Sequence, residues 1–336
     1  MSDPLIVIDA DVLGRRRTGD ETYVEGLLRA LPAHGDGLRF AAITRRPELV
    51  PLGIEPIALP ARIQELRMAV RVPLLLRRLR PALAHFVHSL PIALPCPAVL
   101  TVQDLSFERD SSLMGRRESS IFRFVVPRSA RHARRVLAIS QRTKDDLVAF
   151  YGLVPEKIVV TPLAPDPVFR PGGRRGDYLL LVGSIEERKN PLLAADAAAA
   201  VGRRLVVAGP ERDARLGAEL RRRGADMRGF VSKEELVRLY QEAATVLFPT
   251  RHEGFGLPVV EAMACGTPVV ATHDPAVREV GGDAIAYAEP REFAAAVTRV
   301  LADPQPWADA GLERARTFSW ERTAKTTVGV YREVLA

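Results

Sequence analysis

The chain has 336 residues, of which 47% are hydrophobic and 26% are charged, with a net charge of +7. This length is typical of two domains, and the composition excludes disordered, fibrous and coiled-coil proteins. The two cysteines, Cys96 and Cys265, form neither a disulfide framework nor a metal-binding spacing. No apolar run reaches the ~18 residues of a membrane span, and the first residues are acidic where a signal peptide would be basic. We therefore expect a cytoplasmic protein.

Short apolar runs alternate with amphipathic stretches along the whole chain. The runs are continuously apolar, as is typical of parallel strands covered by helices on both faces. We predict strands at residues 5–10, 39–44, 98–103, 136–140, 157–161, 178–183, 204–209, 226–230, 245–249 and 268–272. The predicted helices include residues 20–31, 141–151, 190–200, 232–243 and 257–265. The alternation predicts an α/β protein with right-handed crossovers.

A segment rich in proline and glycine, residues 161–177, interrupts this alternation. We interpret it as the linker between two doubly wound domains, residues 1–166 and 167–319. An amphipathic helix at 320–336 is expected to pack back on the first domain. Neither GxGxxG nor GxxxxGK[ST] occurs in the sequence, which argues against simple dinucleotide and P-loop sites. Ligands are expected in a cleft between the domains, beyond the carboxyl ends of the strands.

The densest cluster of chemically informative residues lies at 245–272. A predicted strand ends near Pro249, a loop passes through Gly254 and Gly256, and Pro258 stands where a helix would begin. Glycines let a backbone approach a ligand closely, and the free N–H groups at a helix start favour an anion or a sugar hydroxyl. Glu253 and Glu261, the latter expected on the first turn of that helix, add two carboxylates that accept hydrogen bonds from a polyhydroxylated ligand.

A pair of cations follows the predicted strand 178–183. Arg188 and Lys189 stand just before Asn190, which we expect to cap a helix that has Pro191 at its first position. Two cations beside a helix start suit a diphosphate. They could also form surface ion pairs with Glu186 and Glu187.

At these residues the sequence resembles glycosyltransferase family 4, the retaining enzymes similar to glycogen synthase and to mannosyltransferases. The stretch from Glu253 to Glu261 resembles the Glu-x7-Glu motif of that family, and VGSIEERKNP resembles its strand and turn with an Arg–Lys pair. GFVSKEELVRLYQEAATVLFPT and RTGDETYVEGLL resemble its base-binding region and its N-terminal glycine loop. The resemblance covers nearly the whole chain. It implies the GT-B fold, in which two Rossmann-like domains face each other across a cleft.

The resemblance also implies a role for each matched residue. Glu261 would bind the ribose hydroxyls of a nucleotide-sugar donor, and Glu253 would hold hydroxyls of the transferred sugar. Arg188 and Lys189 would neutralise the departing diphosphate, so the implied catalytic residues are Arg188, Lys189 and Glu253. The remaining implied donor contacts are Gly19 near the phosphates, Val231 at the nucleobase, and Gly254, Phe255, Gly256 and Leu257 around the sugar and phosphate.

Two positions depart from the family pattern within the predicted donor site. Gln103 stands where the family usually has a histidine, and a glutamine forms hydrogen bonds but does not ionise. Ser184 stands where many members have an arginine. His85 and His88 lie nearby in the sequence, and we expect one of them to occupy the missing histidine's space or both to shape the acceptor side.

The implied reaction moves a sugar from a nucleoside diphosphate to an acceptor hydroxyl with retention of configuration. GDP- and UDP-sugars are both compatible with the motifs, with a slight preference for GDP-mannose. No cofactor and no metal are expected, because the cationic side chains of Arg188 and Lys189 would take the place of a metal beside the diphosphate. A sugar phosphorylase on the same fold and a non-catalytic nucleotide-sugar-binding protein remain alternatives.

The positive charge is concentrated between residues 62 and 135, where 14 arginines face five acidic residues. The expected acceptor is a glycan, a lipid-linked sugar or a small molecule. An anionic membrane surface would suit the arginines, which allows a peripheral location at the inner face of the membrane. The excess could equally be compositional. A nucleic-acid partner is not expected, because no basic stretch with interleaved aromatic residues occurs.

Overall fold

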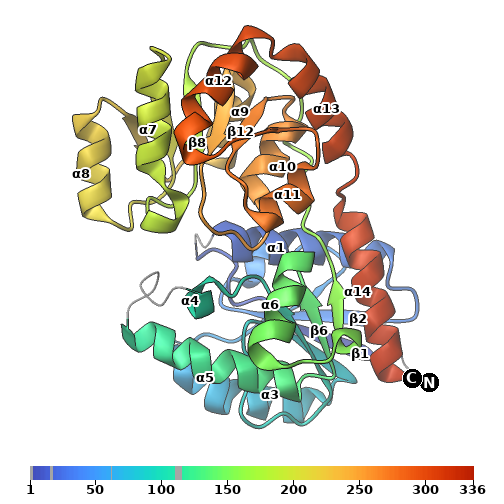
Figure 1. Ribbon diagram of the computed structural model, residues 1–336. Coiled ribbons are helices and arrows are strands. Elements are labelled where there is room, and N and C mark those ends of the chain that lie inside the picture. Colours follow the sequence, from blue (N-terminus) through green and yellow to red (C-terminus); the bar gives the residue numbers. More distant parts are fainter. Residues whose placement is uncertain (1–2, 16–17, 62, 110–115) are drawn as a thin grey trace. The chain divides into compact units, whose positions relative to one another are not determined.

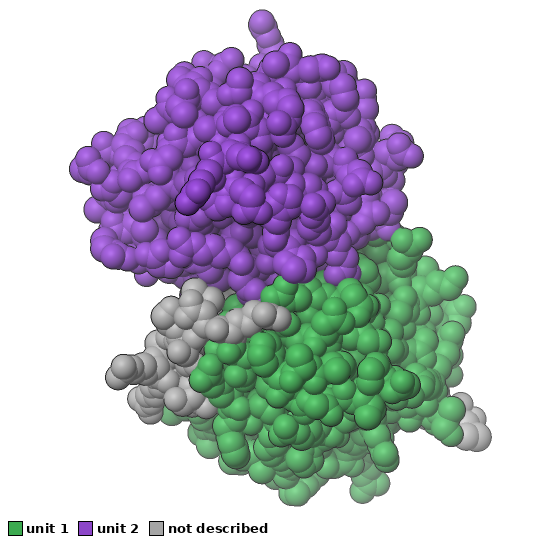
Figure 2. All heavy atoms as spheres, viewed as in Figure 1, with its two compact units in different colours: residues 1–164, 319–336 green, residues 165–318 purple. Residues whose placement is uncertain are grey.

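The computed structural model describes residues 3–15, 18–61, 63–109 and 116–336. The chain divides into two compact units, which Figure 2 shows in different colours. Unit 1 comprises Met1–Ala164 and Ser319–Ala336, and unit 2 comprises Pro165–Phe318. Each unit is built around one parallel sheet with helices on its faces (Figure 1). The predicted α/β class is confirmed.

Unit 1 has a seven-stranded sheet in the order β3-β2-β1-β4-β5-β6-β7. The chain builds outward from β1 in one direction and then crosses over to continue from β4 in the other. The carboxyl ends of β1 and β4 therefore flank a topological switch point, where ligands bind in sheets of this kind. The strands are β1 (Leu5–Asp9), β2 (Arg39–Thr44), β3 (Glu55–Ala58), β4 (Leu83–Val87), β5 (Ala98–Val102), β6 (Arg135–Ala138) and β7 (Ile158–Val160).

The helices of unit 1 cover both faces of this sheet. Alternate strand residues such as Ala84 and Leu100 share one core cluster with residues of α3, α5 and α6. The intervening residues point to the opposite face, where α14 packs beside α1. The helices are α1 (Thr18–Ala30), α2 (Gln64–Leu66), α3 (Val72–Leu79), α4 (Ser106–Arg109), α5 (Arg116–His132), α6 (Gln141–Tyr151) and α14 (Trp320–Leu335). A π-helical turn, Arg67–Arg71, joins α2 to α3, so residues 64–79 are continuously helical.

Unit 2 has a six-stranded parallel sheet in the order β10-β9-β8-β11-β12-β13. Its switch point lies between β8 and β11. The strands are β8 (Leu179–Val182), β9 (Leu205–Ala208), β10 (Asp226–Gly229), β11 (Thr245–Phe248), β12 (Val269–Ala271) and β13 (Ala286–Tyr287). The helices are α7 (Pro191–Ala200), α8 (Ala214–Arg222), α9 (Lys233–Glu242), α10 (Leu257–Ala264), α11 (Pro275–Gly281), α12 (Phe293–Ala302) and α13 (Gln305–Ala315).

Within the described residues, all ten predicted strands and all six predicted helices are present, and three further strands were not predicted from the sequence. β3 is a largely exposed edge strand that contains Pro56, which is tolerated only where no neighbour needs its N–H group. β4 is buried, but His85 interrupts its apolar run. β13 has only two residues.

Candidate functional site

The residues predicted to be catalytic lie together beyond the carboxyl ends of β8 and β11, at the switch point of unit 2. A short 3₁₀ turn, Glu187–Lys189, follows β8 and leads into α7. The loop after β11 carries Glu253 and leads into α10. A backbone hydrogen bond from Arg251 N to Arg188 O, 2.7 Å long, joins the two loops. Its length is within the usual range for such bonds.

Lys189, Arg188 and Glu253 form a buried ion cluster. Lys189 Nζ donates to Oε1 of Glu253, and Arg188 Nη1 lies 3.4 Å from Oε2 of the same carboxylate. Thr250 Oγ1 lies 3.0 Å from Glu253 Oε1. Arg188 also pairs through Nε with Glu186 at 2.9 Å. Glu253 is 6% exposed and Lys189 is 9% exposed, so this carboxylate is not a solvated loop residue.

The surroundings of this cluster determine its protonation. Burial by itself would raise the pKa of Glu253, but the charges of Lys189 and Arg188 and the hydrogen bonds it accepts outweigh burial, so its pKa is lowered. Burial and the neighbouring charge of Arg188 lower the pKa of Lys189, while the attraction of Glu253 opposes that shift. The cluster therefore holds an ionised Glu253 against two cationic side chains.

Helix α10 begins next to Glu253 and presents its N-terminus to the same region. Gly256 is its N-cap residue, with a φ of 106° that favours glycine, and Pro258 lies in its first turn. Within the described part of the chain, the amides of Phe255, Gly256 and Leu257 donate to no other backbone group. These amides and the helix dipole make the start of α10 favourable for an anion.

Glu261 lies deeper on α10 than the sequence indicated. It is the fifth residue of the helix, so the prediction that it belongs to the first turn is wrong. Its carboxyl group is buried and accepts a hydrogen bond of 2.9 Å from Tyr240 Oη of α9. Burial raises the pKa of Glu261 to about 8. Tyr240 could not be predicted from the sequence, because nothing in the local pattern distinguishes this tyrosine from an ordinary core residue.

The other predicted contacts in unit 2 lie in loops that follow strands of the same sheet. Ser184 follows β8, and its hydroxyl donates to Glu186 at 2.8 Å, so Ser184 positions the carboxylate that pairs with Arg188. Val231 is half-buried in the turn between β10 and α9. Asn190 precedes α7 as predicted, but its backbone is left-handed (φ 49°) and its side chain makes no capping bond. Asn190 is therefore the N-cap residue as predicted, without a capping bond from its side chain.

The predicted contacts in unit 1 also lie next to each other. A Cβ atom added at Gly19, near the start of α1, would lie 3.7 Å from Oε1 of Gln103, which follows β5. Gln103 is 7% exposed, and its Nε2 atom has no hydrogen-bond partner among the described residues. A buried donor without a partner is costly, so its presence is compatible with a ligand oxygen at this position.

The two histidines near β4 have different surroundings. His85 is fully buried, with Nδ1 2.6 Å from Tyr331 Oη of α14 and Nε2 2.7 Å from Thr101 Oγ1. Burial lowers its pKa to about 3. His85 therefore links α14 to the sheet, and the expectation that it serves the site is wrong. His88 instead follows the carboxyl end of β4, has a φ of 63°, and lies with Nε2 3.1 Å from Asp20 Oδ1 of α1.

The described residues show neither a metal cluster nor a membrane-spanning helix. Among them, no group of three or more His, Cys, Asp or Glu side chains is arranged to hold a metal ion. None of the helices in the described ranges combines the length and apolar character needed to cross a bilayer.

Family models match both halves of the chain. A model described as "Glycosyltransferase Family 4" matches residues 17–168, and one described as "Glycosyl transferases group 1" matches residues 176–303. The chain belongs to glycosyltransferase family 4. The resemblance inferred from the Glu253–Glu261 motif is thereby confirmed.

Curated relatives of this family member include sugar transferases with different acceptors. The chain is 39% identical over 110 residues to "O-antigen chain mannosyltransferase B" of Escherichia coli, covering 31% of this chain and 29% of the relative. It is 32% identical over 244 residues to "D-inositol 3-phosphate glycosyltransferase" of Frankia alni, covering 60% and 59%. It is also 32% identical over 233 residues to "MMP alpha-(1->4)-mannosyltransferase" of Mycolicibacterium hassiacum, covering 62% and 56%. The matches thus span less than two thirds of each relative.

Solved structures show the same fold along nearly the whole chain. Sucrose-phosphate synthase from Thermosynechococcus elongatus superposes with a TM-score of 0.81 at 18% identity, covering 98% of this chain and 99% of that one. Anabaena HepE in complex with UDP-glucose superposes with a TM-score of 0.73 at 15% identity, with the same coverage. These matches confirm the predicted GT-B fold class.

Proposed function

We propose that the protein is a retaining glycosyltransferase that moves a sugar from a nucleoside diphosphate to an acceptor hydroxyl. The observation that carries this proposal is the Lys189–Arg188–Glu253 cluster beside the N-terminus of α10. It combines cations, unoccupied backbone donors and a hydroxyl-binding carboxylate at one switch point. A diphosphate-linked sugar needs all three.

The cluster also suggests what the donor changes when it binds. Both cations lie against one carboxylate, Glu253. A diphosphate offers Lys189 and Arg188 alternative oxygen partners of higher charge. Their movement toward the phosphates would release the oxygens of Glu253 to accept hydrogen bonds from hydroxyls of the transferred sugar. Donor binding and sugar recognition are coupled in this way.

Glu261 and the turn at Val231 are assigned to the nucleoside. Tyr240 already donates to Oε2 of Glu261, which leaves Oε1 for the ribose hydroxyls. Val231 is assigned to the nucleobase through its backbone, and Gly254 and its three successors to the sugar and phosphate. In unit 1, Gly19 and Gln103 are assigned to the donor, with the partnerless Nε2 atom of Gln103 supporting a ligand oxygen there.

In the proposed reaction, the bond between the anomeric carbon and the phosphate oxygen breaks. The bond from that carbon to the acceptor oxygen forms on the same face of the sugar. The acceptor's proton passes to the departing phosphate oxygen. Lys189 and Arg188 stabilise the negative charge that develops on the diphosphate, and we propose that they do so without a metal.

The donor and acceptor are proposed from the relatives. Two of the relatives described above are named as mannosyltransferases, which favours GDP-mannose, whereas HepE was solved with UDP-glucose. We propose an acceptor among glycans, lipid-linked sugars and small phosphorylated molecules. The last class is supported by the relative named as a D-inositol 3-phosphate glycosyltransferase.

Calorimetric titration with UDP, GDP and ADP, first without metal and then with Mg²⁺, tests the donor site. We expect one nucleotide to bind without metal, and Glu261→Ala to weaken that binding at least tenfold. Glu219→Gln, at a half-buried position on α8, is the control and should leave nucleotide binding unchanged. Absence of binding to all three nucleotides would refute the donor site.

Sugar transfer is then measured with the matching nucleotide-sugar and candidate acceptors. Donor binding without transfer or hydrolysis would favour the non-catalytic alternative. Activity that depends on orthophosphate would favour a phosphorylase.

A further inference from the structure

The helical segment 64–79 of unit 1 exposes a row of aliphatic side chains. Leu66, Val70 and Leu74 are 47%, 43% and 51% exposed and recur every four residues, which aligns them along one side of the helix. Ile63, which precedes the helix, is 57% exposed. Exposed apolar residues are ordinary when scattered, but a row of four in one segment is a feature that normally contacts something.

The opposite side of the same segment anchors it to unit 1. Val72 and Leu76 are buried in the core cluster that α3 shares with α5 and α6. Arg67 is fully buried and pairs with Asp9 at the end of β1. The exposed row is therefore not needed to hold the helix in place.

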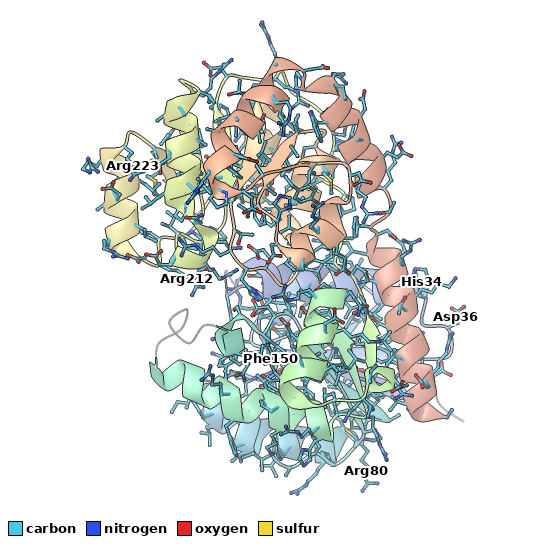
Figure 3. The ribbon with its side chains drawn as sticks, in the orientation of Figure 1. His34, Asp36, Arg80, Phe150, Arg212 and Arg223 are labelled. Carbon is cyan, nitrogen blue, oxygen red and sulfur yellow. The ribbon has the colours of Figure 1, made fainter. Side chains whose placement is uncertain are left out.

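Arginines without carboxylate partners continue the apolar row. Arg77 and Arg78 lie one turn beyond Leu74, and Arg80 ends the helix at the surface of unit 1 (Figure 3). None of the three forms an ion pair with another described residue. We call Ile63, Leu66, Val70, Leu74, Arg77, Arg78 and Arg80 the 63–80 surface.

Helix α8 of unit 2 provides an internal comparison. It also ends in consecutive arginines, but Arg221 pairs with Glu211, Arg222 with Glu219, and Arg223 with Asp196. No large hydrophobic side chain of α8 is exposed. The 63–80 surface therefore differs from α8 in two ways: its arginines have no carboxylate partner among the described residues, and they lie beside exposed aliphatic side chains.

Neighbouring elements on the same face of the sheet also expose large hydrophobic side chains. Phe124 of α5 is 72% exposed, and Ile92, in the loop between β4 and β5, is 73% exposed. Arg128 Nη2 of α5 donates to Ile92 O at 3.0 Å, which holds this loop against α5. Because α3 and α5 share one core cluster, these side chains belong to the same face of unit 1.

We propose that the 63–80 surface docks unit 1 onto a bilayer containing anionic phospholipids. Helices with an apolar side and flanking basic residues lie in the headgroup region, where the aliphatic groups leave water and the cations meet lipid phosphates. The positive charge of this surface is complementary to such a bilayer. The proposal does not depend on which sugar is transferred. It also assigns membrane contact to one segment, residues 63–80, of the arginine-rich 62–135 region.

Sedimentation with vesicles tests the docking. Wild-type protein should bind vesicles of phosphatidylcholine and phosphatidylglycerol, should not bind phosphatidylcholine alone, and should be released by 0.5 M salt. Arg77→Gln/Arg78→Gln should weaken binding about 30-fold at low salt, because each basic residue near an anionic surface contributes a factor of about five. Val70→Ser/Leu74→Ser should weaken binding at least tenfold.

Arg221→Gln/Arg222→Gln on α8 is the matched control, because it removes the same charge from an arginine-rich helix without exposed apolar residues. It should leave vesicle binding within about twofold of wild type. Circular dichroism and nucleotide titration of the same preparations show whether the variants fold and whether the donor site survives. A failure to dock with normal nucleotide binding would therefore refute the docking alone.

Three results would overturn the proposal. Wild-type protein would bind no better to anionic than to neutral vesicles, the two variants of the 63–80 surface would bind like wild type, or the α8 control would lose as much affinity as they do. If the Val70→Ser/Leu74→Ser variant instead abolished a dimer observed by analytical ultracentrifugation, the surface would be an interface between two copies of the chain.

Discussion

Replacing Lys189 with methionine should destabilise unit 2 by about 3 kcal/mol. Both Lys189 and Glu253 are more than nine-tenths buried. Removing one partner of a buried ion pair costs about 3–5 kcal/mol, because the remaining charge is left uncompensated in a poorly solvated site. The cost should fall at the lower end here, since Arg188 Nη1 stays 3.4 Å from Glu253 Oε2 and Thr250 Oγ1 lies 3.0 Å from Oε1.

Adding Glu253→Gln to that variant should restore most of the lost stability. The amide has the shape of the carboxylate but no charge, so the double variant no longer holds an uncompensated anion. We expect it to be about 1 kcal/mol less stable than wild type. Because Glu253→Gln alone should also destabilise unit 2, the coupling energy between the two residues should exceed about 2 kcal/mol in magnitude.

The two tryptophans allow the stability of unit 2 to be measured separately for the wild type, the two single variants and the double variant, which together form a double-mutant cycle. Trp307 packs against the core of unit 2, whereas Trp320 belongs to unit 1. In a Trp320→Phe background, the fluorescence of Trp307 during urea unfolding reports the stability of unit 2 for all four members of the cycle. Additive effects, with a coupling energy within about 0.5 kcal/mol of zero, would refute the interpretation of Lys189 and Glu253 as one charge-compensated unit.

Three further predictions concern buried positions. The stability of unit 2 should fall by up to about 1.4 kcal/mol per pH unit between pH ~4.3 and 8, because folded Glu261, with a pKa of about 8, keeps a proton that the unfolded chain has lost; urea unfolding of Glu261→Gln should lack this slope. His85, with a folded pKa of about 3, should make unit 1 lose stability at a similar rate as the pH falls from ~6.5 toward 3, and acid titration of His85→Phe should be flatter. Gly209→Ala should prevent or severely weaken folding of unit 2, seen by circular dichroism and proteolysis, because the added Cβ would lie 2.0 Å from Gly183 O; a variant of near wild-type stability would contradict the close approach of these loops.

Periodicity along the chain was sufficient to predict most of the architecture. Continuous apolar runs separated by amphipathic stretches identified ten strands, because buried parallel strands need apolar side chains on both faces. The positions of Glu253 and Glu261 around two glycines and a proline likewise indicated a loop and helix start that present carboxylates to a ligand. These patterns are local, so a few consecutive residues are enough to reveal them.

Tertiary packing decided what each of these side chains contacts. His85 and His88 are three residues apart and equally polar, yet one is buried between the sheet and α14 while the other follows the end of β4 near α1. Tyr240 acquires a partner in Glu261 only because α9 and α10 pack together. Glu253 becomes an ionised, buried group because Lys189, 64 residues away, follows the adjacent strand of the sheet. The electrostatics of a buried carboxylate depend on the neighbours that folding brings to it, and these neighbours come from distant parts of the chain.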